Sequence, residues 1–148
     1  MIVEAQVSIH GSRAATWAAI TDIANAATMI RGIESIEVLE RPASGLVGLR
    51  WRETRILFDK PASVDKWITD AVDHESFRTR AESDGFVFLA TMKIRETAGG
   101  VTLTSIHETR PQGLAASLRG LPMVFFRGVM RKALLQDLED LKSAVERT

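Results

Sequence analysis

The sequence contains no cysteine, so it forms no disulfide and offers no cysteine nucleophile. It also lacks an excess of charge, because its 19 basic side chains are matched by 19 acidic ones. Nucleic-acid-binding modules usually show a basic excess, so we expect no nucleic-acid partner. No apolar run approaches the roughly 18 residues of a membrane span, so we expect no integral membrane association.

Targeting and catalytic motifs are missing as well. The stretch MIVEAQVSIHG at residues 1–11 has neither a basic start nor a long apolar core, which predicts no signal peptide and, with the lack of cysteine, favours a cytoplasmic location. The three histidines show no metal-ligand spacing, and we expect neither a metal nor a cofactor. No GxSxG motif is present, and neither GKS nor GKT follows Gly45 and Gly48, which argues against a nucleophilic serine and a phosphate loop.

The strongest pattern in the chain is a helix predicted over residues 122–145. At 100° per residue its apolar side chains form one stripe, which comprises Met123, Met130, Leu134, Leu138, Leu141 and Val145. Pro122 suits the first helical position, because its missing N–H would have no partner there. Two charged residues, Arg127 and Asp137, project onto the apolar side. At 1.5 Å per residue the helix would be roughly 36 Å long, enough to cross a small domain.

Most of the remaining chain alternates as strands do. Residues 2–9 predict a strand, and the Ala-rich residues 13–30 predict two short helices that break near Thr21 after a Ser12 cap. Six more strands are predicted at residues 33–40, 49–58, 63–72, 75–83, 86–96 and 101–109, with turns at Asp73-His74, Asp84-Gly85 and Gly99-Gly100. Short turns predict one antiparallel sheet with one face to bury, which the long helix would cover. We therefore expect one α+β domain over residues 1–148.

Three stretches and this order of elements carry a resemblance to a known family. The stretches are TWAAITDIANAATMIRGIESIEVLE at residues 16–40, VGLRWRETR at Val47–Arg55 and MRKALLQDLEDLK at Met130–Lys142. They resemble the START-like (SRPBCC) superfamily, and within it the polyketide cyclase/dehydrase and lipid transport type. The resemblance implies a helix-grip fold, in which a curved seven-stranded antiparallel sheet wraps around a long C-terminal helix, with two short helices between strands 1 and 2. It also implies a cavity between sheet and helix for a small hydrophobic or amphipathic ligand, lipid- or polyketide-like.

Three polar residues are candidates for a role inside such a cavity. Glu53 and Arg55 share strand parity with Trp51, so both charges face the cavity if Trp51 does. They then orient a polar group of the ligand, or they pair with each other or with neighbouring strands, as buried charges usually do. Arg55 is also one possible partner for Asp137. His107 shares parity with the apolar residues of the last strand, and is either a general acid/base or a hydrogen-bonded wall residue.

The apolar candidates for the ligand-binding lining come from several elements. With the charged Arg127 as a possible anchor, they are Trp51, Phe77, Phe88, Met92, Leu118, Leu121, Phe125, Phe126 and Met130. Core packing is the alternative for each of them. The segment 112–122 carries a short apolar stripe that forms either a gate to the cavity or a patch against a second subunit, so a homodimer is one possibility.

Binding of a small hydrophobic ligand without a catalytic centre is the leading interpretation, and it requires a cavity of at least about 300 Å³ between sheet and helix. One alternative is an enzyme of the polyketide aromatase/cyclase type that uses Glu53, Arg55 and His107, whose side chains would then converge on one point of the cavity. Another is a protein-interaction module of the same fold, for which the apolar start of the last helix is the only support.

Overall fold

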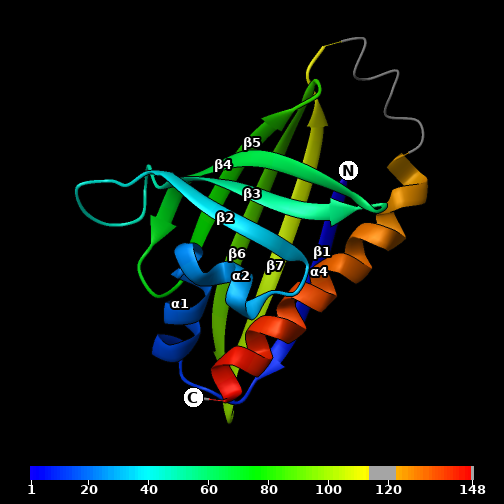
Figure 1. Ribbon diagram of the computed structural model, residues 1–148. Helices are drawn as coiled ribbons and strands as arrows, with labels where there is room; N and C mark the ends of the chain where they lie inside the picture. The colour runs from blue at the N-terminus through cyan, green and yellow to red at the C-terminus, as the bar shows by residue number, and fades with distance from the viewer. Residues whose placement is uncertain (114–122, 148) are drawn as a thin grey trace.

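The computed structural model describes residues 1–113 and 123–147, and of residues 123–126 it describes the backbone only. A seven-stranded antiparallel sheet forms the larger part of the fold (Figure 1). Its strands are β1 (Ile2–Ile9), β2 (Ile33–Glu40), β3 (Arg50–Leu57), β4 (Lys60–Val72), β5 (Ser76–Ser83), β6 (Phe86–Thr97) and β7 (Gly100–Pro111). They lie in the order β1-β7-β6-β5-β4-β3-β2, so every pair except β1-β7 joins strands that follow one another in the chain. The predicted antiparallel sheet is confirmed.

The helices lie on one side of this sheet. Between β1 and β2 the chain forms α1 (Arg13–Thr21), the short 3-10 turn η1 (Ile23–Asn25) and α2 (Ala26–Met29), and α4 (Met123–Glu146) follows the sheet. The Ser12 hydroxyl accepts a hydrogen bond from the Ala15 amide at 3.0 Å, as predicted for the cap of α1. Asp22 accepts from the side chain of Asn25 and caps no backbone amide, so the helical stretch restarts as a 3-10 turn.

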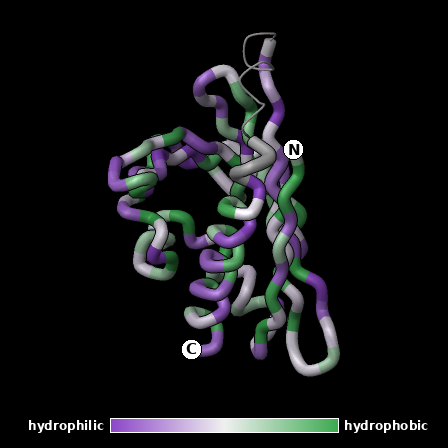
Figure 2. Tube along the Cα trace, turned by 90° about the vertical axis from the view of Figure 1, so that its right-hand side faces the viewer, coloured by the Kyte–Doolittle hydropathy of each residue, from purple (hydrophilic) through white to green (hydrophobic). Residues whose placement is uncertain are grey.

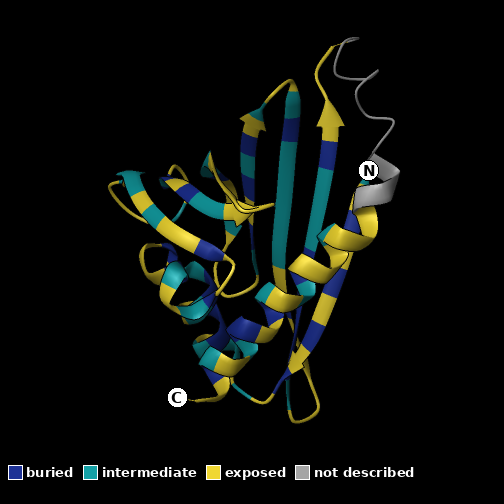
Figure 3. Ribbon diagram, turned by 45° about the vertical axis from the view of Figure 1, so that its right-hand side comes forward, coloured by how far each residue is buried: buried dark blue, intermediate teal, exposed yellow. Residues whose placement is uncertain are grey.

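The concave face of the sheet and α4 enclose the core. The odd residues of β1 are buried and the even ones exposed, and Figure 2 shows the corresponding alternation of hydrophobic and hydrophilic segments along the strands. On α4 the buried side chains are Leu134, Leu138, Asp140, Leu141 and Val145. Figure 3 shows this helix crossing the sheet obliquely, with its buried positions toward the strands. The predicted stripe is therefore correct over this half of the helix.

Several predicted strand boundaries differ from the observed ones by one to three residues, and two of these differences follow from the geometry of a turn. The fourth strand begins at Lys60 and not at residue 63, because Phe58 and Asp59 form a two-residue turn with φ of 51° and 65°. Such left-handed turns match the twist of a hairpin, but in a sequence they are usually recognised by glycine or asparagine, which this turn lacks. The last turn uses Ala98 and Gly99, whereas Gly100 already belongs to β7, where a Cβ would collide with the carbonyl of Ile9.

Asp140 is a buried polar anchor of α4 that the sequence pattern did not predict. Its carboxylate accepts hydrogen bonds from the Arg31 backbone amide at 2.9 Å, the Arg31 Nε at 3.2 Å and the Gln136 side chain at 3.1 Å. Burial acts to raise the pKa of Asp140, but the hydrogen bonds and charge of Arg31 outweigh it and hold the pKa below its ordinary value. This contact ties the turn between α2 and β2 to the helix. Within the described residues, no helix is both long and apolar enough to cross a membrane.

The core position of α4 leads to a stability prediction. Leu138 is 1% exposed, whereas Val129 on the same helix is 58% exposed. We expect Leu138→Ala to lower the free energy of unfolding by about 2–5 kcal/mol, because the truncation leaves a cavity in the core. The control Val129→Ala should change it by less than about 0.5 kcal/mol. Urea unfolding measures both, and equal losses would contradict this placement of the helix.

Candidate functional site

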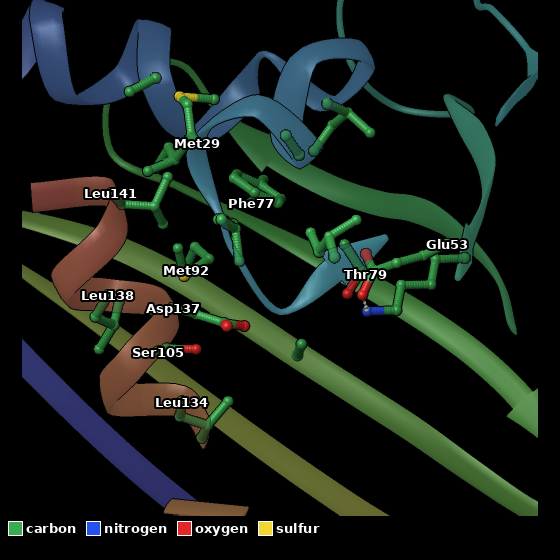
Figure 4. Close-up of a pocket in the computed structure, with 18 of the residues that line it drawn as sticks. Met29, Glu53, Phe77, Thr79, Met92, Ser105, Leu134, Asp137, Leu138 and Leu141 are labelled. Carbon is green, nitrogen blue, oxygen red and sulfur yellow. Dashed lines mark hydrogen bonds and ion pairs between the residues drawn. The ribbon is translucent and has the colours of Figure 1, made fainter. Parts of the chain in front are cut away.

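Two hollows lie on the concave face of the sheet and share part of their walls. The inner hollow, of about 120 Å³, lies between the sheet, the α1–α2 segment and α4, and its lining is mainly apolar (Figure 4). The outer hollow, of about 340 Å³, is lined by residues of β3, β4, β5 and β6 and by His107 of β7. Glu53, Arg55, Lys66 and His107 line both hollows and so mark their boundary. The hollow between sheet and helix is smaller than the roughly 300 Å³ expected for the ligand cavity, so that expectation is not met there. The outer hollow exceeds this volume, but none of its lining residues lies on α4.

Four charged residues on three elements form one ion-pair network at this boundary. Glu53 is 6% exposed, and its Oε2 accepts from the Arg55 Nε at 2.8 Å and from the Lys66 Nζ at 3.0 Å. The terminal nitrogens of Arg55 donate to both carboxylate oxygens of Asp137 on α4, at 3.2 and 2.8 Å. We call Glu53, Arg55, Lys66 and Asp137 the charged quartet. Glu53 and Arg55 thus face the cavity and also pair with each other.

The charged quartet is electrically balanced at neutral pH. Burial acts to raise the pKa of Glu53, but the charges of Lys66 and Arg55 outweigh it and lower the pKa to about 2. Burial likewise acts to lower the pKa of Arg55, but the hydrogen bond to Asp137 and the charge of Glu53 hold the pKa above its ordinary value. Two cations therefore compensate two carboxylates, and the quartet offers no net charge to a ligand.

His107 lies beside the charged quartet without joining it. Among the described residues, its ring makes no hydrogen bond and no ion pair, although it lines both hollows. Burial, followed by the charges of Lys66 and Arg55, lowers the pKa of His107 to about 4, and Glu53 opposes this shift only in part. The imidazole is therefore neutral at pH 7, with one nitrogen that donates and one that accepts. In chemical terms it is a hydrogen-bonding group available to a ligand.

Pattern reasoning missed three further polar residues of the inner hollow, Lys66, Thr79 and Ser105. Strand parity carries a signal for Ser105, which lies two residues before His107 on β7. Lys66 becomes recognisable only through the register of β3 and β4, which places it opposite Trp51. Thr79 and Ser105 are buried, and within the described part of the chain their hydroxyls have no hydrogen-bond partner. Figure 4 labels Thr79 and Ser105 among the side chains that line the hollow.

Four of the apolar residues predicted for the lining lie at the hollows. Trp51, Phe77 and Met92 line the inner hollow, and Phe88 lines the outer one. Trp51 also donates to the Glu53 Oε1 at 3.4 Å, so its indole N–H is part of the polar boundary. The aromatic ring of Phe77 packs edge-on against Trp17, with ring centroids 6.1 Å apart. The apolar wall is thus continuous with the core beneath α1.

The remaining predicted lining residues do not take part in either hollow as far as they are described. Met130 is partly buried and packs against the core, and Arg127 is exposed on α4. The predictions for Leu118, Leu121 and the side chains of Phe125 and Phe126 lie outside the described residues. Among the described His, Asp and Glu side chains, no group of three or more is placed to hold a metal ion.

Comparison with known proteins adds a family and a fold. The sequence model of the family described as "Polyketide cyclase / dehydrase and lipid transport" matches residues 1–146. No curated protein matches the chain at a significant level.

Solved structures resemble the chain over nearly its whole length. TTHA0849 from Thermus thermophilus has a TM-score of 0.82 at 15% identity, covering 99% of this chain and 98% of its own. A START superfamily protein from Mycobacterium smegmatis has a TM-score of 0.81 at 13% identity, with 99% and 97% covered. The Zhui aromatase/cyclase from a Streptomyces species has a TM-score of 0.76 at 16% identity, with 99% and 94% covered. At these identities the likeness shows the fold, which is the predicted helix-grip arrangement.

The charged quartet leads to a prediction about stability. In Glu53→Gln the cations Arg55 and Lys66 would face a neutral amide, so we expect the free energy of unfolding to fall by about 3 kcal/mol. This value is the lower end for a broken buried pair, because each cation keeps about a quarter of its side chain exposed. Adding Lys66→Met should recover part of that loss, because it removes the excess positive charge. The control Glu37→Gln breaks only an exposed pair with Arg52 and should cost less than about 1 kcal/mol. Urea unfolding at pH 7 measures the stability of all three variants. If Glu53→Gln loses no more stability than the control, the charged quartet does not stabilise the fold as predicted.

His107 leads to a prediction about pH. Its pKa in the folded protein, about 4, lies below the ordinary 6.5 of the unfolded chain, so the unfolded state binds the proton first as the pH falls. The contribution of His107 to stability is therefore fully present above pH 6.5 and is lost progressively between pH 6.5 and 4. Unfolding midpoints at pH 7.5 and 5 should differ less in His107→Gln than in the unchanged protein. If the unfolding midpoints of the two proteins change equally with pH, the predicted lowering of the His107 pKa is wrong.

Proposed function

The chain belongs to the polyketide cyclase/dehydrase and lipid transport family, and from this premise we propose that it binds a small hydrophobic or amphipathic molecule in the two hollows of its concave face. The observation that carries the proposal is the arrangement of these hollows. An apolar inner space meets a larger outer space at a boundary of polar side chains. Ligand pockets commonly combine a mainly apolar wall with a few polar groups that fix orientation.

The inner hollow supplies the hydrophobic part of the binding energy. Its wall includes Ile20, Ile23, Ile30 and Leu138, which also belong to the core. Each Å² of apolar surface that a ligand buries there contributes about 25 cal/mol, so a ligand fragment burying 100 Å² gains roughly 2.5 kcal/mol before the costs of association. The outer hollow has room for the remainder of a longer molecule.

A reaction of the aromatase/cyclase type is the second candidate, and one observation favours it. Glu53, Arg55 and His107 meet at the boundary of the two hollows, as such an enzyme would require. Against it stands the state of these groups. The Glu53 carboxylate is committed to two cations, and its pKa of about 2 makes it a poor base at neutral pH. The pKa of His107, about 4, is also far from the working pH of an efficient general acid or base. We therefore rank binding above catalysis.

Association with a protein partner ranks third. The support for a homodimer or an interaction module was the apolar stretch up to residue 126, and its side chains from residue 114 onward lie outside the described residues. A cytoplasmic location belongs to the proposal as well, and it is supported only by the sequence features given above.

Native mass spectrometry of the protein purified from its own host tests the proposal directly. We expect a mass above that of the chain by the mass of one small organic molecule, released when the protein is unfolded. The same spectrum reports the oligomeric state. A protein that carries nothing and also fails to bind the hydrophobic dye of the next test would overturn the proposal.

A larger side chain in the inner hollow should weaken ligand binding. Ala90 lines the inner hollow, whereas its neighbour Thr91 points to the opposite face of the sheet. We expect Ala90→Leu to weaken the binding of the neutral dye N-phenyl-1-naphthylamine at least about tenfold, because the added carbons occupy space that the dye needs. Thr91→Leu is the matched control and should bind as the unchanged protein does. Dye fluorescence measures both, with circular dichroism to confirm folding, and unchanged binding in a folded Ala90→Leu variant would place the ligand elsewhere.

A further inference from the structure

The polar side chains of the inner hollow fall into two sets. The members of the charged quartet form ion pairs with one another. Thr79, Ser105 and His107 form the second set, and within the described part of the chain these three side chains have no hydrogen-bond partner. No described side-chain polar atom is both fully buried and without a partner, so the polar atoms of these three residues are reached from the hollow and are open to a molecule inside it. We call these three residues the neutral triad.

The neutral triad surrounds a gap in the floor of the hollow. Thr79 on β5 pairs with Ala90 on β6, and Ala90 pairs with His107 on β7, so the three lie in one row across the sheet. Adjacent strands are about 4.8 Å apart, which puts Thr79 and His107 about 10 Å apart at the backbone. Ala90 between them contributes one side-chain carbon. Ser105 lies on the same face of β7, about 7 Å along the strand from His107. A ligand group above Ala90 is therefore within reach of polar atoms on both sides.

The chemistry of the neutral triad selects an uncharged partner. A hydroxyl both donates and accepts hydrogen bonds, and a neutral imidazole does the same through its two nitrogens. Neither supplies a full charge to replace the water around a buried carboxylate or ammonium group, whose desolvation is costly. The nearby cations do not fill this role, because Arg55 and Lys66 are already neutralised by Glu53 and Asp137. A carbonyl or hydroxyl oxygen matches the neutral triad, whereas a charged group does not.

We propose that the inner hollow recognises an uncharged, oxygen-bearing group of its ligand, a hydroxyl or a carbonyl on an apolar ring or chain, through Thr79, Ser105 and His107. This inference rests on the proposed binding function and specifies its ligand class. The size of the inner hollow agrees, because its 120 Å³ is close to the roughly 150 Å³ of an apolar cavity that holds benzene. One ring or a short chain carrying the oxygen enters it, and the rest of the molecule lies in the outer hollow beyond the charged quartet.

Three probes of one size and shape separate the possibilities: naphthalene, 2-naphthol and 2-naphthoate, at pH 7. We expect 2-naphthol to bind more tightly than naphthalene by about three- to tenfold for each hydrogen bond formed, and 2-naphthoate to bind more weakly than 2-naphthol. Thr79→Val, Ser105→Ala and His107→Phe should each reduce the binding of 2-naphthol severalfold and leave that of naphthalene nearly unchanged. Thr91→Val, on the opposite face of β6, is the matched control. Probe fluorescence gives the affinities and circular dichroism confirms folding.

The outcomes distinguish the inference from the function on which it rests. If naphthalene and 2-naphthol bind equally, and the three substitutions affect neither, the ligand class is wrong while hydrophobic binding stands. If 2-naphthoate binds most tightly and Lys66→Met abolishes that preference, the charged quartet is the anchor and the inference is overturned. If none of the probes binds, the inference is overturned, and the proposed function fails with it only when the dye and the native mass spectrum are negative too. Should His107→Phe not fold, the valine and alanine variants carry the test alone, because each removes only a hydroxyl or changes it to a methyl group.

Discussion

One helix covers a seven-stranded sheet in this protein, and that mismatch of widths underlies the rest of the structure. A helix with its side chains is about 10–12 Å across, whereas seven strands at about 4.8 Å spacing span roughly 29 Å. A flat sheet would leave most of one apolar face in water. Curvature brings both sides of the sheet toward α4, and the α1–α2 segment covers the end that α4 leaves open (Figure 1). The hollows on the concave face are the space that these elements do not fill.

The charged quartet lies at the hollows. It links β3 and β4 to α4 across the hollow, through the bonds of Arg55 to Glu53 and Asp137. A buried ion pair seldom adds much net stability relative to apolar residues, but it is costly to break and it has a fixed geometry. Its effect here is to connect the far side of the sheet to the helix without closing the space between them. Apolar side chains large enough to make the same connection would fill the hollow.

The fold was predictable from the sequence because its signals are local and periodic. The alternation in β1 and the apolar stripe of α4 each depend on a repeat that follows from the geometry of one element. Strand parity also placed Glu53, Arg55 and His107 on the cavity face. The partners of these residues were harder to predict, because Asp137 is 82 positions from Arg55 in the chain and reaches it only through the tertiary fold. Lys66 was missed for the same reason, since a lysine on a strand is usually at the surface and only the register of β3 and β4 turns it inward. The buried Asp140 depends on Arg31, 109 positions away, and no periodic pattern records such a contact.

The neutral triad gives the hollow a polar wall where apolar side chains would pack as well. Valine, alanine and phenylalanine at residues 79, 105 and 107 would pack the same wall without open hydrogen-bonding groups. The polar atoms of the neutral triad are reached from the hollow, so water can satisfy them when no ligand is bound. Local rules of core composition are broken here at three positions that line one hollow, beside charged groups that pair with one another. Departures of this kind gather where a protein is shaped for binding and not for its own packing. A ligand that supplies one oxygen to the neutral triad would both satisfy those groups and replace the water that the apolar wall excludes, so its binding and the stability of the fold are coupled through the same few atoms.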